Sequence, residues 1–453
     1  MKNRRNYIFG ILLGGASILL MGCVNSLLDQ IPTTELGYTE FWQTEEDATN
    51  GLMGAYADVR GLFSRDYYFD GQGEYVRVRD GSGSLSNTTT NITQGAAYKG
   101  GCYFPDPSYR FGAKFDTYYK FCYGGIHRVN YVIENTQKMI PNAKTEESKK
   151  KLETVIGEAR LLRGMIYFRL ISMWGDVPYI DHVVYNQAEM DKIVRTSIAK
   201  IKDYIIEDFN YAFEKLPIKS EQIGRASKPA ALAFKGKLEL YWACWNHFGW
   251  PELDTFTPSE EEARKAYKAA ADDFHAVIND YGLNLFRNGE PGEWGELGDA
   301  NVLPNYFYLF LPTTGNANTD GEIIFAFTHG GPGTGQGESL MRDFAGRNIQ
   351  NSQCWVTPTF RLADRYQSTI TGDFTDPLIP MNPNAPNART TKNSAVNPES
   401  YLNRDYRMKA SMLWDYEMIQ GLASLKKTDW VPFIYKSWNA KVTIYEKHIQ
   451  SLY

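Results

Sequence analysis

Apolar side chains recur at steps of three and four residues through most of the chain between residues 44 and 281. This spacing is the period of an amphipathic helix. Capping patterns at Thr44–Asp47 and Ser259–Glu262 mark the starts of the first and last predicted helices. The first three helices are expected to turn the following residues inward: Leu52, Ala55, Tyr56 and Val59; Tyr119, Cys122, Ile126, Val129, Val132 and Ile133; and Leu152, Val155, Ile156, Ala159, Leu162, Ile166, Leu170 and Met173.

The predicted helices follow one another with short breaks between them. Pro141 closes the second helix, Gly175 and Pro178 close the third, and further periodic segments cover 197–216, 229–245 and 259–281. Neighbouring amphipathic helices of this kind predict antiparallel hairpins stacked as an α-solenoid. The unit size is nearest to that of tetratricopeptide repeats, which are about 34 residues long. We therefore expect a mostly α fold built on a tetratricopeptide-like α-solenoid.

Two parts of the chain lack this period. Residues 70–112 are rich in Gly, Ser, Thr and Asn and include "GSGSLSNTTTNITQG", which predicts a long loop. After about residue 283, "DGEIIFAFTHGG" predicts one strand, and short helices are expected near 357–366 and 406–421. The second half is therefore expected to be loop-rich and irregular, resting on the helical half.

The N-terminus has the pattern of an export signal. Lys2, Arg4 and Arg5 precede the uncharged apolar stretch 8–21, which is shorter than the roughly 20 residues that span a bilayer. The stretch ends in "LMGC", which is similar to a bacterial lipobox, so Cys23 is the predicted lipidation site. Residues 1–22 are then a lipoprotein signal peptide and 23–40 a lipidated tether, and the protein is anchored to a membrane without spanning it.

Composition narrows the classes of function. The net charge of −5 and the sequence pI of about 5.8 provide no basic surface for nucleic acid. Besides Cys23 there are four cysteines, too few for a disulfide framework: Cys102, Cys122, Cys244 and Cys354. One bridge between Cys102 and Cys122 and unpaired buried thiols remain the two alternatives.

Motifs of catalysis are missing from the sequence. The six histidines form no H-E-x-x-H motif, and neither a G-x-S-x-G elbow nor a P-loop occurs. The glycines of "GGPGTGQGES" do not follow the order G-x-G-x-x-G, and a solvated loop explains them better. We therefore expect no metal, no cofactor and no catalytic residue, although a pair of carboxylates distant in sequence stays open.

Aromatic residues make up 14% of the chain, and their position separates two groups. Those at helical spacing are expected in the core: Tyr118, Tyr119, Tyr167, Phe168, Tyr241 and Trp242. Those in predicted loops are candidates for gripping the apolar faces of sugar rings: Tyr98, Tyr103, Phe104, Trp294, Tyr306, Tyr308 and Trp355. Arg79 and Asp80 are candidate polar partners for sugar hydroxyls.

Several stretches, in order, resemble the SusD/RagB family of outer-membrane nutrient-binding lipoproteins. After Cys23 comes "LLDQIP", which is similar to the opening of that family. The resemblance continues through "FWQTEEDATNGLMGAYADV", "GIHRVNYVIEN", "GEARLLRGMIYFRLISMWGDVPYI", "IIEDFNYAFEKLP", "GRASKPAALAFKGKLELYWACWN", "EIIFAF" and "NRDYRM". The segment "GEARLLRG" with its "WGDVP" exit is the most specific piece.

The resemblance implies a right-handed superhelix of helix pairs at 41–282 and a loop-rich C-terminal region at 283–453. It also implies a lipid anchor in the outer leaflet of an outer membrane and pairing with a SusC-like, TonB-dependent transporter. Such proteins bind glycans, or oligopeptides in the RagB-like branch, and are not enzymes. Only Cys23 is carried over residue by residue, because binding aromatics vary within the family.

One departure concerns the C-terminus. Family members usually continue past the position of "YKSWN" into a helix with an R-Y-A-E-V-L-L-like pattern, which this sequence lacks. We therefore expect that the chain is a truncated product, or that its folding and its docking to the transporter are impaired. Glycan capture is the leading hypothesis, with oligopeptide binding and a surface glycoside hydrolase as alternatives.

Overall fold

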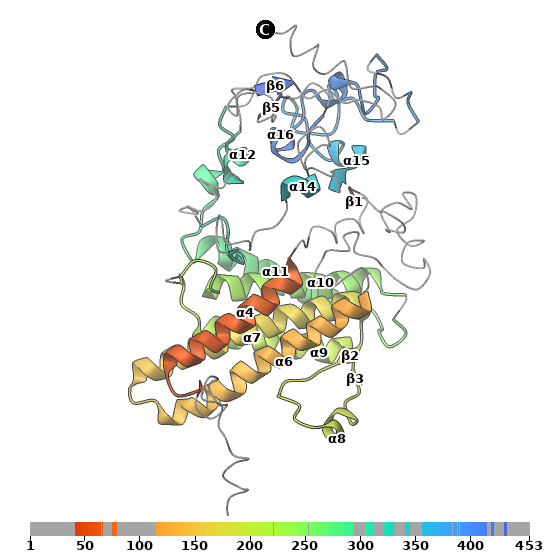
Figure 1. Ribbon diagram of the computed structural model, residues 1–453. Coiled ribbons are helices and arrows are strands. Elements are labelled where there is room, and N and C mark those ends of the chain that lie inside the picture. The colour runs from red at the N-terminus through yellow and green to blue at the C-terminus, as the bar shows by residue number, and fades with distance from the viewer. Residues whose placement is uncertain are drawn as a thin grey trace, which may run out of the picture.

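The computed structural model describes a large part of the chain (Figure 1). The described residues are 41–64, 66, 75–78, 115–220, 222–251, 253–293, 304–310, 321–329, 340–344, 356–382, 384–386, 388, 390–414, 418–420 and 430–432. Structural statements below concern these residues.

Six long helices form the helical region, and each packs against its neighbours in the chain (Figure 1). They are α4 (Glu45–Phe63), α6 (Phe115–Met139), α7 (Glu146–Trp174), α9 (Ile198–Lys215), α10 (Lys228–Phe248) and α11 (Glu260–Asn279). A short 3-10 turn, η4 (Ile140–Asn142), links α6 to α7. Helix α7 is the centre, since it contacts α4, α6, α9 and α10. The predicted mostly α, solenoid architecture is confirmed.

The helix ends follow from local chemistry. The Thr44 hydroxyl accepts from the Asp47 backbone N–H at 3.2 Å, and the Asp47 carboxylate accepts from the Thr44 N–H at 2.7 Å, which completes the predicted capping box. Ser259 caps α11 by accepting from the Glu262 N–H at 3.3 Å. Helix α7 ends at Gly175, whose φ is +68°. A Cβ there would lie 2.8 Å from Leu253 Cδ1, so both backbone and packing require glycine.

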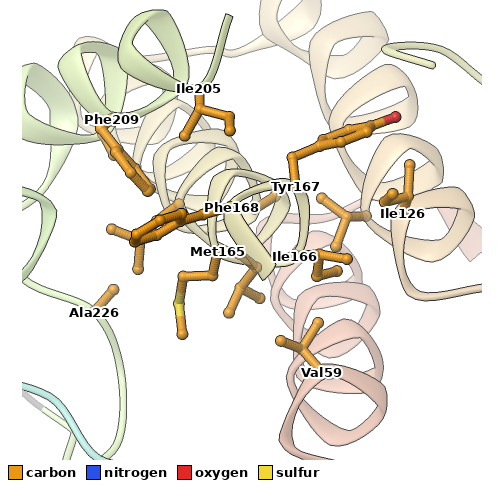
Figure 2. Packing of buried hydrophobic residues seen from close by; sticks show 14 of the residues in the cluster. Val59, Ile126, Met165, Ile166, Tyr167, Phe168, Ile205, Phe209 and Ala226 are labelled. Carbon is orange, nitrogen blue, oxygen red and sulfur yellow. The ribbon is translucent and has the colours of Figure 1, made fainter. Parts of the chain in front are cut away.

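One hydrophobic core runs through the helical region (Figure 2). Figure 2 shows Ile166 of α7 on the side of Val59 and Ile126, which belong to α4 and α6. On the opposite side, Phe209 of α9 packs onto α7 where Gly164 leaves room, since a Cβ at Gly164 would lie 2.5 Å from Phe209 Cε1. Nearly all the predicted inward-facing residues are buried, and Tyr119 and Met173 are half-buried.

Buried polar groups tie the helices together. Arg163 donates to both carboxylate oxygens of Asp208, at 2.8 and 2.7 Å, and to Asn130 Oδ1 at 2.9 Å. All three residues are at most 4% exposed. The Tyr56 hydroxyl donates to Glu158 at 2.7 Å. Because Arg163, Asp208 and Glu158 each have hydrogen-bonded partners, burial does not leave their charges uncompensated.

Between α7 and α9 the chain leaves the helical stack. Strands β2 (Val177–Pro178) and β3 (Arg195–Thr196) pair antiparallel, with Val177 opposite Thr196. Beyond them the chain carries the short helix α8 (Gln187–Met190). We call residues 179–194 the excursion.

Short elements make up the C-terminal region. They are η5 (Phe286–Gly289), α12 (Asn305–Leu309), α14 (Leu340–Phe344), β4 (Val356–Pro358), α15 (Phe360–Ala363), η6 (Pro398–Tyr401), α16 (Arg407–Ser411), β5 (Met418–Gln420) and β6 (Trp430–Pro432). Strand β4 pairs antiparallel with β1 (Val76–Val78), and β5 pairs with β6. A second, smaller core joins Ala363, Met381, Tyr401, Met408, Met412 and Trp414.

Several local predictions were wrong. Residues 321–329 contain no strand, because Phe325 and Phe327 instead pack on Phe234 and Phe63 of the helices. The predicted helix 357–366 begins as strand β4, and the one at 406–421 ends at Ser411 and is followed by β5. The predicted loop 70–112 contains β1. Tyr241 was expected in the core but is 42% exposed. Its ring meets the Phe168 ring edge-on, and the rest of the side chain reaches the surface of α10.

Candidate ligand-binding surface

The structure describes two of the predicted glycan-binding residues, Tyr306 and Tyr308, and both lie on α12. The others lie outside the described residues: Tyr98, Tyr103, Phe104, Trp294, Trp355, Arg79 and Asp80. Cys23 and Cys102 also lie outside them, whereas Cys122 is a buried free thiol. Tyr306 and Tyr308 are half-buried, so part of each side chain reaches the surface.

An arginine covers the ring of Tyr308. The Arg287 guanidinium carbon lies 4.8 Å from the centre of that ring and 5.1 Å from the centre of the Phe286 ring. Arg287 Nη1 also donates to Asn305 Oδ1 at 2.7 Å. The cation–π contact and the hydrogen bond together hold the guanidinium over an aromatic face.

The backbone turn η5 places this arginine. Arg287 and Asn288 have φ values of 51° and 59°, so the chain passes through the left-handed region there. Asn305 locks the turn to α12, since its N–H donates to Pro291 O at 2.9 Å and its Nδ2 donates to Glu290 O at 2.8 Å. The left-handed turn is thus held by α12, the helix that carries both tyrosines.

Tyr306 lies on the other side of the short helix, toward α16. Its ring meets the Phe310 ring edge-on, with centroids 5.0 Å apart, and Phe310 is 62% exposed. Burial, followed by the nearby Tyr366, raises the pKa of the Tyr306 phenol, so it stays neutral and can donate or accept a hydrogen bond.

An ion pair lies near Tyr306. Arg407 Nε donates to Asp405 Oδ1 at 3.0 Å, and its Nη2 donates to Oδ2. Burial acts against ionisation of Asp405, but these hydrogen bonds prevail and lower the pKa of its carboxyl. The same hydrogen bonds raise the pKa of Arg407. The pair therefore stays charged and offers both donors and acceptors beside the tyrosine.

We call Phe286, Arg287, Asn305, Tyr306, Tyr308 and Phe310 the aromatic ledge. It combines aromatic rings with a guanidinium and an amide whose orientations are fixed. Aromatic rings pack against the apolar C–H face of a pyranose, while guanidinium, amide and carboxylate groups bind its hydroxyls. The ledge therefore has the chemistry that a sugar requires.

Sequence reasoning missed Arg287, Asn305 and Phe310. The Asn288–Gly289 pair is a recognised turn signal and could have indicated a tight turn that presents Arg287. Nothing in the sequence indicates that Asn305 bridges that turn to the tyrosines, because the contact joins segments 18 residues apart.

The described residues were also searched for metal-binding groups and for membrane-spanning helices. Among them, no group of three or more His, Cys, Asp or Glu side chains is placed to hold a metal ion. No helix in the described part of the chain has the length and apolar character needed to cross a membrane.

Sequence comparison relates the chain to known proteins. A family model described as "Starch-binding associating with outer membrane" matches residues 82–240. A SusD-like protein from Bacteroides ovatus is 26% identical over 282 residues, covering 62% of this chain and 46% of that protein. SusD-like protein P2 from Formosa agariphila is 26% identical over 230 residues, covering 49% of this chain and 41% of that protein. The chain thus spans somewhat less than half the length of these curated relatives.

A comparison with solved structures also finds SusD-like proteins. The crystal structure of a SusD-like protein from Bacteroides fragilis superposes with a TM-score of 0.54 at 20% identity, covering 84% of this chain and 62% of that one. The two proteins share a helix-rich architecture. The sequence matches and this shared fold support membership of the SusD/RagB family.

Proposed function

We propose that this protein is a cell-surface lipoprotein that captures an oligosaccharide and delivers it to a SusC-like, TonB-dependent transporter. In this proposal, Cys23 carries the lipid anchor in the outer leaflet of the outer membrane. The protein binds its ligand without catalysing a reaction on it. The family relationship supports this class of function, since the matching family description names starch binding and association with the outer membrane.

The observation that carries the proposal for this chain is the stacked arrangement of Arg287 over Tyr308 with Asn305 beside it. Each group is held before any ligand arrives, so little conformational entropy is lost on binding. Tyr306 and the Asp405–Arg407 pair extend the same surface with neutral and charged hydrogen-bonding groups.

The predicted residues outside the described structure remain part of the proposal. Tyr98, Tyr103, Phe104, Trp294 and Trp355 would add aromatic surface, and Arg79 and Asp80 would add polar contacts. Because several weak contacts act together, each is expected to contribute modestly to binding, and attachment to the membrane adds avidity.

The test is glycan retention by affinity electrophoresis in gels that contain different polysaccharides. The double variant Tyr306→Ala/Tyr308→Ala should lose most of its retention, because both tyrosine rings of α12 are removed. Tyr185→Ala is the matched control, since Tyr185 is an exposed tyrosine on the excursion, a different part of the fold. Circular dichroism should show that both variants remain folded.

Unchanged retention of the double variant would contradict a site at the ledge. Calorimetric binding of mixed oligopeptides, without retention on any glycan, would favour the RagB-like alternative. Time-dependent release of reducing ends by the purified protein would favour the glycoside hydrolase alternative.

A further inference from the structure

The excursion, residues 179–194, presents apolar side chains to solvent. Tyr185 is 61% exposed, Met190 is 47% exposed and Val194 is 75% exposed. All three lie within ten residues of one another, on a segment that leaves the helical stack (Figure 1). Single exposed apolar residues are ordinary, but three on one projecting segment suggest a surface that meets another phase or molecule.

The base of this segment is firmly held. Asn130 Nδ2 donates to Ile180 O at 2.9 Å and to His182 O at 3.0 Å, and Arg163 Nη1 donates to Asp181 O at 2.9 Å. The Tyr167 hydroxyl donates to Ile180 O at 3.0 Å. The excursion is therefore bonded to the most buried polar groups of the helical region, and it presents its tip in a defined position.

The tip has its own cross-link. His182 lies between Asp181 and Glu189, with Nδ1 at 2.8 Å from the first carboxylate and Nε2 at 2.8 Å from the second. This bridge joins the turn before Tyr185 to helix α8, which ends in Met190. Tyr185 is also fixed, because its hydroxyl donates to Glu134 of α6 at 2.7 Å.

The position of the excursion in the fold indicates what its apolar side chains contact. In Figure 1, α8 lies on the side of the helical region that faces away from α14, α15 and α16. The described chain begins at Phe41, and the neighbouring Trp42 ring lies 5.7 Å from the Tyr131 ring of α6. Tyr131 directly follows Asn130, which binds the excursion. Trp42, which lies two residues after the predicted tether, and the excursion therefore contact α6 at adjacent residues.

The tether length brings a bilayer within reach of this end. Eighteen residue steps separate Cys23 from Phe41, and an extended chain covers at most about 60 Å over that length. The cations that could face a lipid surface lie around Val194, at the end of the excursion. Glu189 and Asp191 are bonded within the excursion, while Lys192 and Arg195 are exposed beside Val194.

We propose that the excursion rests on the membrane to which the protein is anchored, with Tyr185, Met190 and Val194 at the boundary between headgroups and acyl chains. Lys192 and Arg195 would face the anionic headgroups. This contact orients the body and turns the C-terminal region, with its aromatic ledge, away from the bilayer. Val194, an exposed apolar side chain between Lys192 and Arg195, has the pattern typical of such interfacial contacts, whereas Met190 lies between Glu189 and Asp191. The inference rests on the lipid anchor at Cys23 in the proposed function.

The test uses the acylated full chain in vesicles of phosphatidylethanolamine and phosphatidylglycerol. A Val194→Cys variant is labelled with an environment-sensitive fluorophore, and Ile278→Cys is the matched control, because Ile278 is 66% exposed on α11. The unsubstituted chain, labelled in parallel, corrects for native thiols. We expect a blue shift and at least twofold quenching by nitroxide-bearing lipids at position 194, and neither at position 278.

Flotation of the vesicles tests the lipid anchor at Cys23 separately from the membrane contact of the excursion. Protein that floats, but whose label at position 194 behaves like the one at 278, overturns the membrane contact and leaves the anchor intact. Protein that does not float overturns the anchor and the contact together. A label at position 194 that responds only when a transporter protein is added assigns the surface to that protein and overturns the lipid as its occupant.

Discussion

The helical region and the C-terminal region are stabilised in different ways. In the helices, the backbone satisfies its own hydrogen bonds, and a continuous core of interdigitated side chains holds the elements together. In the C-terminal region the elements are short, so many backbone carbonyls need donors from elsewhere. Arg404 supplies three of them, to Ser400 O at 3.0 Å, Ala363 O at 2.6 Å and Ile379 O at 2.9 Å.

Among the described residues, each region has one buried arginine, and the two arginines have different partners. Arg163 mainly binds the buried carboxylate of Asp208 between two regular helices. Arg404 pairs with Asp364 but mainly connects irregular segments, by donating to three of their carbonyls. The comparison teaches that a loop-rich region with a small core depends on polar cross-links for its shape. Three predictions test this difference, in order of expected effect.

Replacing Arg163 by alanine should have the largest effect. Asp208 would be left as a buried charge without its main partner, which costs about 3–5 kcal/mol of unfolding free energy. Urea denaturation followed by circular dichroism measures the change. The exposed Arg264→Ala of α11 is the control and should stay within about 0.5 kcal/mol. Equal midpoints for the two variants would contradict the structural role of the ion pair.

Replacing Arg404 by alanine should act locally. Loss of its hydrogen bonds removes the Arg404 donor from the carbonyls of Ser400 and Ile379 and the charged partner from Asp364, which costs about 2–4 kcal/mol of local stability. Hydrogen exchange measured by mass spectrometry should show faster exchange in residues 360–414 and unchanged exchange in α7. The exposed Lys392→Ala is the control. Uniformly faster exchange in both regions would show that they unfold as one unit.

The smallest predicted effect is a pH dependence within the helices. Burial of Glu239 on α10, followed by the charge of Asp273 on α11, raises the pKa of its carboxyl to about 7. The folded state therefore binds this proton more tightly than the unfolded state, in which the pKa is near 4.5. The stabilisation is complete below about pH 4.5 and declines as the pH rises through about 7.

Glu239→Gln should remove this decline. Lys235 of α10 lies 3.0 Å from Asp273 and Lys202 of α9 lies near Glu239, so they offset part of the cost of charging the pair. We expect the wild type to lose about 1–2 kcal/mol relative to this variant between pH 5 and pH 8. Glu207→Gln, on the exposed side of α9, is the control. Parallel pH profiles for wild type and Glu239→Gln would rule out this titration.

The sequence predicted the helical region well and the C-terminal region poorly. The six long helices α4, α6, α7, α9, α10 and α11 and the caps at Thr44 and Ser259 were predicted because their signals lie within a few neighbouring residues, whereas the short helix α8 was not predicted. "EIIFAF" was read as a strand because its composition suits one. In the structure its phenylalanines fill gaps between helices, a role that depends on Phe63 and Phe234 elsewhere in the chain.

The candidate site shows the same limit. Loop position and aromatic character led to Tyr306 and Tyr308, while Arg287 and Asn305 emerged only from the contacts between η5 and α12. The exposure of Tyr241 was not predicted. Helical spacing identifies the apolar face of a helix, but it does not show how much of that face the neighbouring helices cover.

The amino-acid sequence alone determined that the chain is a helical array, where its long helices begin and end, and which family it resembles. These properties arise from interactions between residues a few positions apart, which periodicity and capping patterns record. Only the tertiary structure decided that Arg287 covers Tyr308, that Arg404 joins the irregular segments, and that Asn130 of α6 holds the base of the excursion. Those contacts join distant segments, and their geometry depends on how the whole chain packs.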